Sequence, residues 1–189
     1  SIRYDAKLDM RMDQAQSFNA CELVNTYDEQ GLMQILRDYG ELRSAGKIAQ
    51  AIVKRRQEVK IETTAQLNEI LMHFFSETNK NKLLAMAYQA LRIEVNQELK
   101  ALKSMLTQAT DLLKPNGRLC VIAYHSLEDR LVKRFIKNGN FTNEPLKDFY
   151  GNSLSKLKQV GKPVVPNDNE TKQNNRARSA RMRIAQKIG

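Results

Sequence analysis

The sequence predicts an α/β protein that also carries a small all-α domain, and three patterns lead to this prediction. Residues 17–75 hold four short amphipathic segments, and a longer helical pattern covers residues 83–113. An unbroken apolar run, residues 118–124, follows the helix breaker Pro115-Asn116-Gly117. A helix, a turn and a buried strand form the second half of a βαβ unit, which favours a parallel sheet covered on both faces.

The four short segments have recognisable ends. Ser17 is expected to cap the first helix, Thr26 or Asp28 the second and Thr63 the fourth, while Gly40 ends the second. No repeat period is present, so these helices predict a small bundle rather than a solenoid. Residues 1–16 are polar and irregular and predict a connector whose methionines pack while its charges pair. His73, beside the apolar face of the fourth helix, is interpreted as a structural histidine.

The pattern over residues 83–113 predicts one continuous helix, because its apolar residues recur at steps of three and four. Arg92 and Asn96 lie one helical turn apart, so both side chains leave the same face. Two interpretations of this pair stay open. The residues contact a ligand, or they are a solvated arginine and an asparagine that caps nothing.

The segment His125-Ser126-Leu127-Glu128-Asp129 follows the predicted strand directly. Ser126 and Asp129 match a capping box for the next helix, which is a purely structural explanation. His125 has no such role in this pattern. It lies at the carboxyl end of a strand, where open α/β sheets bind ligands.

The last third of the chain is an aromatic and polar insertion, residues 139–161, followed by a possible edge strand over residues 162–165 and a final strand near residues 181–185. Alternation places Met182 and Ile184 toward a core, with Arg181 and Arg183 facing out. Arg176 and Arg178 precede this strand and are expected to bind phosphate together. The alternative is a solvated basic edge that prevents aggregation.

Charge is concentrated in this last third. Through Asp129 the chain has 17 Lys and Arg against 17 Asp and Glu, whereas from Arg130 onward it has 14 against 4. This excess predicts a nucleic-acid partner rather than a membrane, because no amphipathic anchor rich in Trp or Phe accompanies it. Cys21 and Cys120 lie in apolar patterns and predict reduced core residues of a cytoplasmic protein. No Cys/His spacing predicts a metal site.

Four motifs, in order, resemble the bacterial 16S ribosomal RNA (cytosine-N4)-methyltransferase family, and the resemblance covers the whole chain. These motifs are Leu8-Asp9-Met10-Arg11-Met12-Asp13, Gln89-Ala90-Leu91-Arg92-Ile93-Glu94-Val95-Asn96-Gln97-Glu98-Leu99, His125-Ser126-Leu127-Glu128-Asp129-Arg130 and Asn175-Arg176-Ala177-Arg178-Ser179-Ala180. The resemblance implies a Rossmann-like methyltransferase domain with an inserted helical domain. It assigns residues 1–16 to a connector, 17–82 to the insert and 83–189 to the second half of the catalytic domain.

The resemblance also implies the chemistry, which is S-adenosylmethionine-dependent methylation of the N4 amine of a cytidine in 16S ribosomal RNA of the small subunit. It suggests His125, Glu128 and Asp129 as catalytic residues. Contacts to RNA are expected from the remaining polar residues of these motifs and of the final strand: Arg92, Asn96, Ser126, Arg130, Arg176, Arg178 and Arg181.

The cofactor motifs of that family, a Gly-rich loop, an acidic strand end and an Asp-Leu-Gly segment, do not occur in this sequence. We therefore expect a C-terminal portion that binds no S-adenosylmethionine and is inactive on its own, and a homodimer formed through the exposed sheet edge. The rival interpretation is a noncatalytic basic RNA-binding protein.

Overall fold

The computed structural model describes residues 5–189, so the first four residues of the expected connector lie outside the described part. The chain divides into two compact units, Ser1–Glu98 and Leu99–Gly189. Each unit has its own hydrophobic core. The predicted fold class, α/β with a small helical domain, is confirmed. The assignment of residues 17–82 to an inserted domain stays a prediction.

The first unit is helical. Its core consists of fully buried aliphatic side chains such as Ile48, Leu67 and Leu91, which recur on the inner faces of its helices. The four predicted short helices are all present. The helices of this unit are α1 (Ala20–Thr26), α2 (Glu29–Asp38), α3 (Ala45–Glu58), α4 (Thr64–Met72) and α5 (Lys80–Val95).

Two of the predicted caps are correct and one is wrong. Asp28 caps α2 and Thr63 caps α4 through their side-chain oxygens, as the sequence predicts. The cap of α1 is Asn19 rather than Ser17. The Asn19 side chain accepts from the Glu22 amide while the Glu22 carboxylate accepts from the Asn19 amide, and this reciprocal pair fixes the start of the helix.

The predicted continuous helix over residues 83–113 is wrong, because the structure has two helices, α5 and α6 (Glu98–Leu112). Gln97 lies between them with φ +50°, a left-handed conformation that cannot continue a helix. Asn96 ends α5 and ties it to the connector. Its amide donates to the Met10 carbonyl over 2.8 Å, and its side-chain oxygen accepts from the Met12 amide over 2.7 Å.

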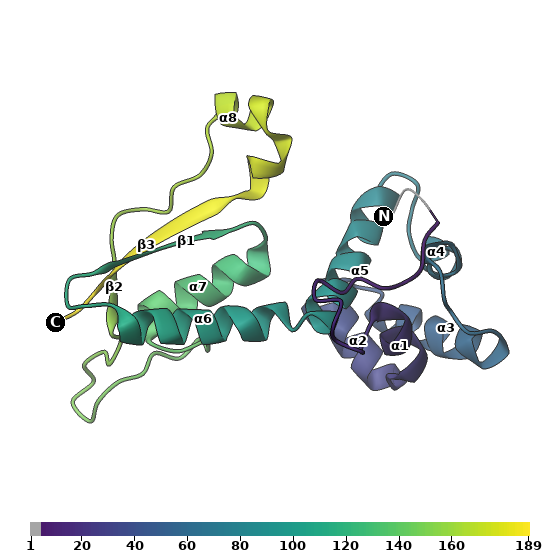
Figure 1. Cartoon of the computed structure of the whole chain (residues 1–189), viewed down its shortest axis with the longest axis horizontal. Helices are drawn as coiled ribbons and strands as arrows, with labels where there is room; N and C mark the ends of the chain where they lie inside the picture. Colours follow the sequence, from purple (N-terminus) through teal and green to yellow (C-terminus); the bar gives the residue numbers. More distant parts are fainter. Residues whose placement is uncertain (1–4) are drawn as a thin grey trace. The chain divides into compact units, whose positions relative to one another are not determined.

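The second unit is a three-stranded sheet with two long helices on one face (Figure 1). Side chains of α6, α7 and all three strands, among them Leu106, Phe135 and Ala185, form its core. The strand order is β1-β3-β2, and both pairings are antiparallel. Besides α6, the elements are β1 (Arg118–Ala123), α7 (Ser126–Asn138), β2 (Leu157–Gln159), α8 (Asp168–Gln173), the 3₁₀ helix η1 (Asn175–Ser179) and β3 (Arg181–Lys187).

The surroundings of β1 differ from the prediction in two ways. Its described neighbour is antiparallel, and only one of its faces is covered: Val121 and Ala123 are buried, whereas Ile122 is 55% exposed. Cys120 is on the same open face as Ile122, so its prediction as a core residue is wrong. The expected edge strand at residues 162–165 is only an isolated bridge between Val164 and Met182.

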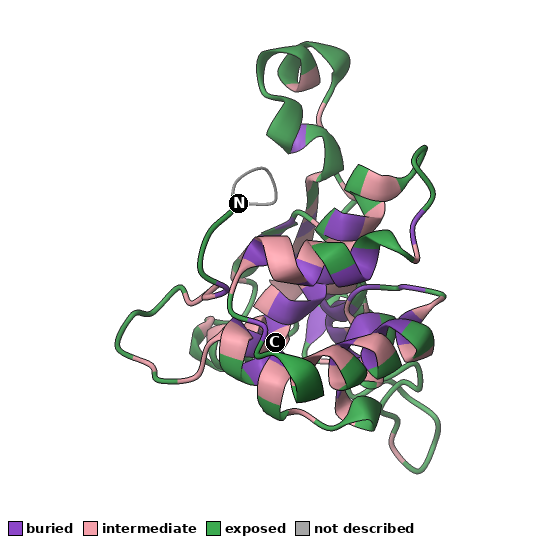
Figure 2. Ribbon diagram, turned by 90° about the vertical axis from the view of Figure 1, so that its right-hand side faces the viewer, coloured by how far each residue is buried: buried purple, intermediate pink, exposed green. Residues whose placement is uncertain are grey.

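The final strand is present, but its predicted orientation is wrong. Arg183 and Ala185 face the core, whereas Met182 and Ile184 lie half-buried on the opposite face. The segment before β3, with α8 and η1, is mostly exposed (Figure 2), and Ala177 is its buried residue. Among residues 5–189, no helix has the length and apolar character needed to cross a membrane.

The caps allow a direct test of the first unit. Asn19→Ala should lower the free energy of unfolding by about 1 kcal/mol, because it removes one side of the reciprocal cap of α1. The matched variant Ser17→Ala should change it by no more than a few tenths of a kcal/mol, since Ser17 is exposed and makes no cap. Urea unfolding followed by circular dichroism measures both, and equal effects would contradict the observed cap.

Candidate functional site

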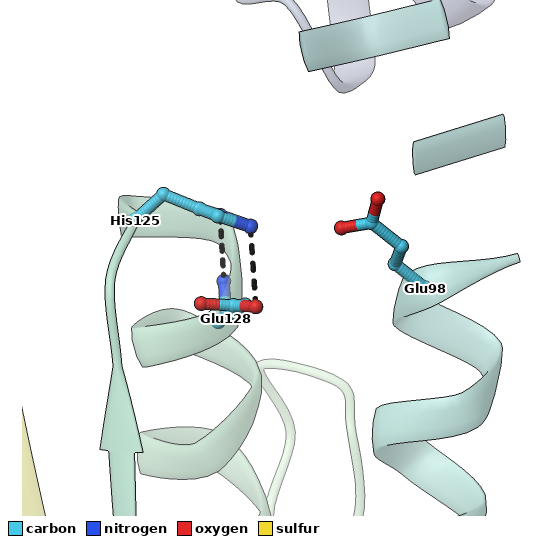
Figure 3. A group of neighbouring side chains, drawn as sticks. All are labelled: Glu98, His125 and Glu128. Atoms are coloured by element: carbon cyan, nitrogen blue, oxygen red, sulfur yellow. Dashed lines mark hydrogen bonds and ion pairs between the residues drawn. The ribbon is translucent and has the colours of Figure 1, made fainter. Parts of the chain in front are cut away.

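His125 joins the end of β1 to the start of α7 (Figure 3). It is the N-cap of α7, with extended backbone angles of φ −139° and ψ 162°. Its ring Nδ1 accepts a hydrogen bond from the Glu128 amide over 3.4 Å. The capping pattern predicted for Ser126 and Asp129 is therefore wrong, and the cap is the residue for which the sequence suggested no structural role.

The cap determines which ring nitrogen of His125 carries the proton. A nitrogen that accepts a hydrogen bond is unprotonated, so the neutral ring holds its proton on Nε2. Nε2 is buried and lies 3.3 Å from the Glu128 carboxylate Oε1, but it is not aligned for a hydrogen bond with any described atom. His125 thus presents a donor, not an acceptor, to this site.

Glu128 is the acceptor of the site. Its Oε2 accepts from the Tyr124 amide over 3.0 Å, which fixes the carboxylate against the end of β1. Burial raises the pKa of Glu128, but the contact with the His125 ring and the hydrogen bond from Tyr124 lower it by more, so the net shift is downward. The carboxylate is therefore ionised at neutral pH. The positive end of the α7 dipole also favours this charge.

Asp129 belongs to a buried ion pair. Its Oδ1 accepts from Arg183 Nε over 2.7 Å, its Oδ2 accepts from Arg183 Nη2 over 2.9 Å, and Arg181 adds a bond of 3.2 Å. Burial raises the pKa of Asp129, and the two arginines lower it by more, so its net pKa is below the usual carboxyl value. The pair explains why Arg183 faces inward, and it anchors the first turn of α7 to β3.

The remaining residues predicted to contact RNA are separated into several groups. Ser126 and Arg130 lie exposed on the first turns of α7, near Glu128 in sequence. Arg176 and Arg178 are exposed on η1, on either side of buried Ala177, and they have no hydrogen bond or ion pair from their side chains in the described chain. Arg181 is half-exposed and bound to Asp129.

Arg92 and Asn96 belong to the first unit and have local partners there. Arg92 binds Glu98 through two hydrogen bonds of 2.7 and 3.0 Å. Asn96, besides binding the connector, donates to the Arg92 carbonyl over 2.8 Å. The interpretation that Asn96 caps nothing is wrong, since it ends α5. The predicted RNA contacts of both residues stay predictions.

Sequence reasoning missed the structural importance of Arg183. Alternation in an amphipathic strand assigns an arginine to the open face, and only its pairing with Asp129 reverses that assignment. The available signal is a pair of arginines in the final strand together with a carboxylate in α7, more than 50 residues earlier. Such a signal depends on spatial proximity, which no local pattern reveals.

The buried pair allows a stability prediction. Asp129→Asn should lower the free energy of unfolding at neutral pH by about 3–5 kcal/mol, because Arg183 would keep a buried charge without its counter-ion. Asp111→Asn is the matched control. It removes the carboxylate of an exposed pair with Lys156, and it should lower the free energy of unfolding far less, because water screens that pair.

The pH dependence of the same comparison has a definite sign. Because the pKa of Asp129 is lowered in the folded state, its stabilisation is present above the ordinary carboxyl pKa of 3.8 and is lost as pH falls through the lowered value. The stability difference between wild type and Asp129→Asn should therefore shrink on acidification below that pH. A difference that grows on acidification would contradict the assignment. Urea midpoints at several pH values measure it.

Comparisons with known proteins agree on a family. A family model described as the MraW methylase family matches residues 1–188. A curated relative from Flavobacterium johnsoniae, named ribosomal RNA small subunit methyltransferase H, is 55% identical over 188 residues. Proteins of the same name from Christiangramia forsetii and Cytophaga hutchinsonii are 50% and 51% identical. The match covers 100%, 100% and 99% of this chain, but only 62%, 62% and 63% of the three relatives. The chain belongs to the MraW methylase family.

Proposed function

We propose that this chain is part of an enzyme that methylates the N4 amine of a cytidine in 16S ribosomal RNA, with S-adenosylmethionine as methyl donor. The observation that carries the proposal is the ionised Glu128 carboxylate, held with the His125 ring at the end of β1 in a chain of this family. The relatives' name supports ribosomal RNA of the small subunit as substrate.

The exocyclic amine of cytidine is a poor nucleophile, because its lone pair is delocalised into the ring. An enzyme improves it by holding the amine in line with the methyl group and by accepting its hydrogens. Glu128 suits this role since its carboxylate is ionised and is held in place at the end of β1. The base must also leave its stack to reach such a site.

His125 and Asp129 fit positioning roles around Glu128. With its proton on Nε2 and its Nδ1 engaged in the cap of α7, His125 has no free nitrogen to accept a proton from substrate. Asp129 fixes the start of α7 through Arg183, and both of its oxygens are engaged there. Arg176 and Arg178 are proposed phosphate contacts, because their side chains are exposed and have no partner within residues 5–189.

We assign no residue of this chain to S-adenosylmethionine. The turn that follows β1 is Tyr124-His125, not a Gly-rich loop. The glycines with positive φ, Gly139, Gly151 and Gly161, all lie beyond α7. No step of the chemistry is therefore assigned to this chain's contact with the cofactor. The free edge of β1, which pairs only with β3 among described strands, supports the proposed homodimer.

The rival function, a noncatalytic basic RNA-binding protein, accounts for the arginines and for the cap at His125, but it gives no role to the ionised Glu128 carboxylate at the end of β1. Enzymatic methylation separates the two. In the full-length protein, Glu128→Gln should lower the rate of methyl transfer to small-subunit RNA by about 10²-fold or more, because the amine loses its charged acceptor. His125→Ala should also slow the reaction, since it releases the carboxylate from its fixed position.

His73→Ala is the matched control, because His73 is the other histidine of this chain and is exposed at the end of α4. It should leave the rate unchanged. Incorporation of a radiolabelled methyl group measures all three variants. Wild-type rates in both Glu128→Gln and His125→Ala would contradict the proposed site, and the absence of transfer by the unsubstituted protein would contradict the function.

A further inference from the structure

A hairpin, residues 146–154, ends in two aromatic side chains that play no part in either core. It forms part of the open loop between α7 and β2 in Figure 1. Phe149 is 98% exposed and Tyr150 is 86% exposed, and their rings meet edge to face with centroids 5.6 Å apart. Large aromatic side chains at this exposure gain little from folding, so their contribution must be sought in binding.

The turn that carries both rings is held by its own hydrogen bonds. The Asp148 carboxylate accepts from the amides of Tyr150 and Asn152 over 2.9 and 2.8 Å, and the Asn152 side chain donates to it over 3.0 Å. These bonds lower the pKa of Asp148, so the carboxylate stays ionised. Gly151, with φ +87°, permits the reversal. The aromatic pair is thus presented by an ordered turn.

The hairpin also carries a free cation. Lys147 is exposed, and its side chain has no hydrogen bond or ion pair among the described residues. The carboxylate of its neighbour Asp148 is engaged by the turn, as described above. The hairpin therefore combines flat aromatic faces with a free cation, a combination that suits a chain of unpaired bases joined by phosphates.

We propose that this hairpin, the aromatic finger, stacks on an unpaired base of the RNA substrate through Phe149 or Tyr150, while Lys147 contacts phosphate. The proposal rests on the RNA substrate of the proposed function and adds a second contact to it. A membrane surface fits less well, because the ionised Asp148 carboxylate and the polar amides of the same turn would enter the bilayer with the rings.

The finger and Glu128 lie at opposite ends of α7. That helix has 13 residues and is therefore about 20 Å long. The finger consequently reaches a nucleotide other than the methylated one, and the RNA that contacts both must extend along the second unit. Its effect is on RNA binding and placement, not on the chemical step.

The absence of Trp from this chain provides a probe. We would introduce Phe149→Trp into the full-length protein, with any tryptophan outside this chain replaced by Phe. Titration with a single-stranded RNA oligonucleotide should quench the indole fluorescence, whereas an abasic oligonucleotide of the same length should not. Anisotropy of labelled RNA should show that Phe149→Ala combined with Tyr150→Ala raises Kd about tenfold.

Two variants serve as controls for that measurement. Phe149→Tyr keeps an aromatic face and should retain the wild-type Kd. Leu112→Ala removes an apolar side chain that is 85% exposed on α6 and should also leave Kd unchanged. Unaltered thermal unfolding of the double variant is expected, because neither ring is buried.

Three results would contradict base stacking by the aromatic finger. The first is RNA binding without quenching, the second is a wild-type Kd for the double variant, and the third is quenching by anionic vesicles but not by RNA. Failure of the proposed function has a different signature. A protein whose finger responds to bases, but which transfers no methyl group, would support the finger and contradict the enzyme assignment.

Discussion

The buried pair between Asp129 and Arg183 determines the arrangement of the second unit. Both groups have left water, so the pair is tolerated only because two short hydrogen bonds and a third from Arg181 satisfy the carboxylate. It connects the first turn of α7 with the central strand β3. The start of α7 is therefore fixed relative to the sheet, and so are the two residues that form the candidate site.

The site follows from this anchoring by local interactions. His125 caps α7 through Nδ1, which leaves its proton on Nε2, and Glu128 receives the Tyr124 amide. A helix N-terminus, a backbone amide and an imidazole thus surround one carboxylate and keep it ionised. An ionised acceptor at the carboxyl end of a strand suits a substrate with a weakly nucleophilic amine. The cap makes His125 a positioning residue.

The sequence predicts the helices, caps and strands that depend on residues close together in the chain. It does not predict the features that depend on contacts between residues far apart in the chain. The caps at Asp28 and Thr63, the four short helices and the strand before His125 follow from local patterns, and all are present. The break at Gln97 is not predicted, because it accompanies hydrogen bonds between Asn96 and the distant connector. The residues of β3 that face the core are predicted on the wrong side of the strand. Alternation assigns an arginine to the open face unless its buried carboxylate partner is known. The position of His125 was predicted, but its capping role was not.

The tautomer of His125 is the most direct test of this account. Long-range ¹⁵N–¹H correlation spectra distinguish the two ring nitrogens, and His73 provides an internal reference because its Nδ1 lies 2.6 Å from the Glu69 carbonyl and must donate to it. The account predicts opposite tautomers for the neutral rings, with the proton on Nε2 in His125 and on Nδ1 in His73. A proton on Nδ1 of His125 would contradict the cap. It would free Nε2 to accept a proton from substrate, and the roles of His125 and Glu128 would have to be exchanged.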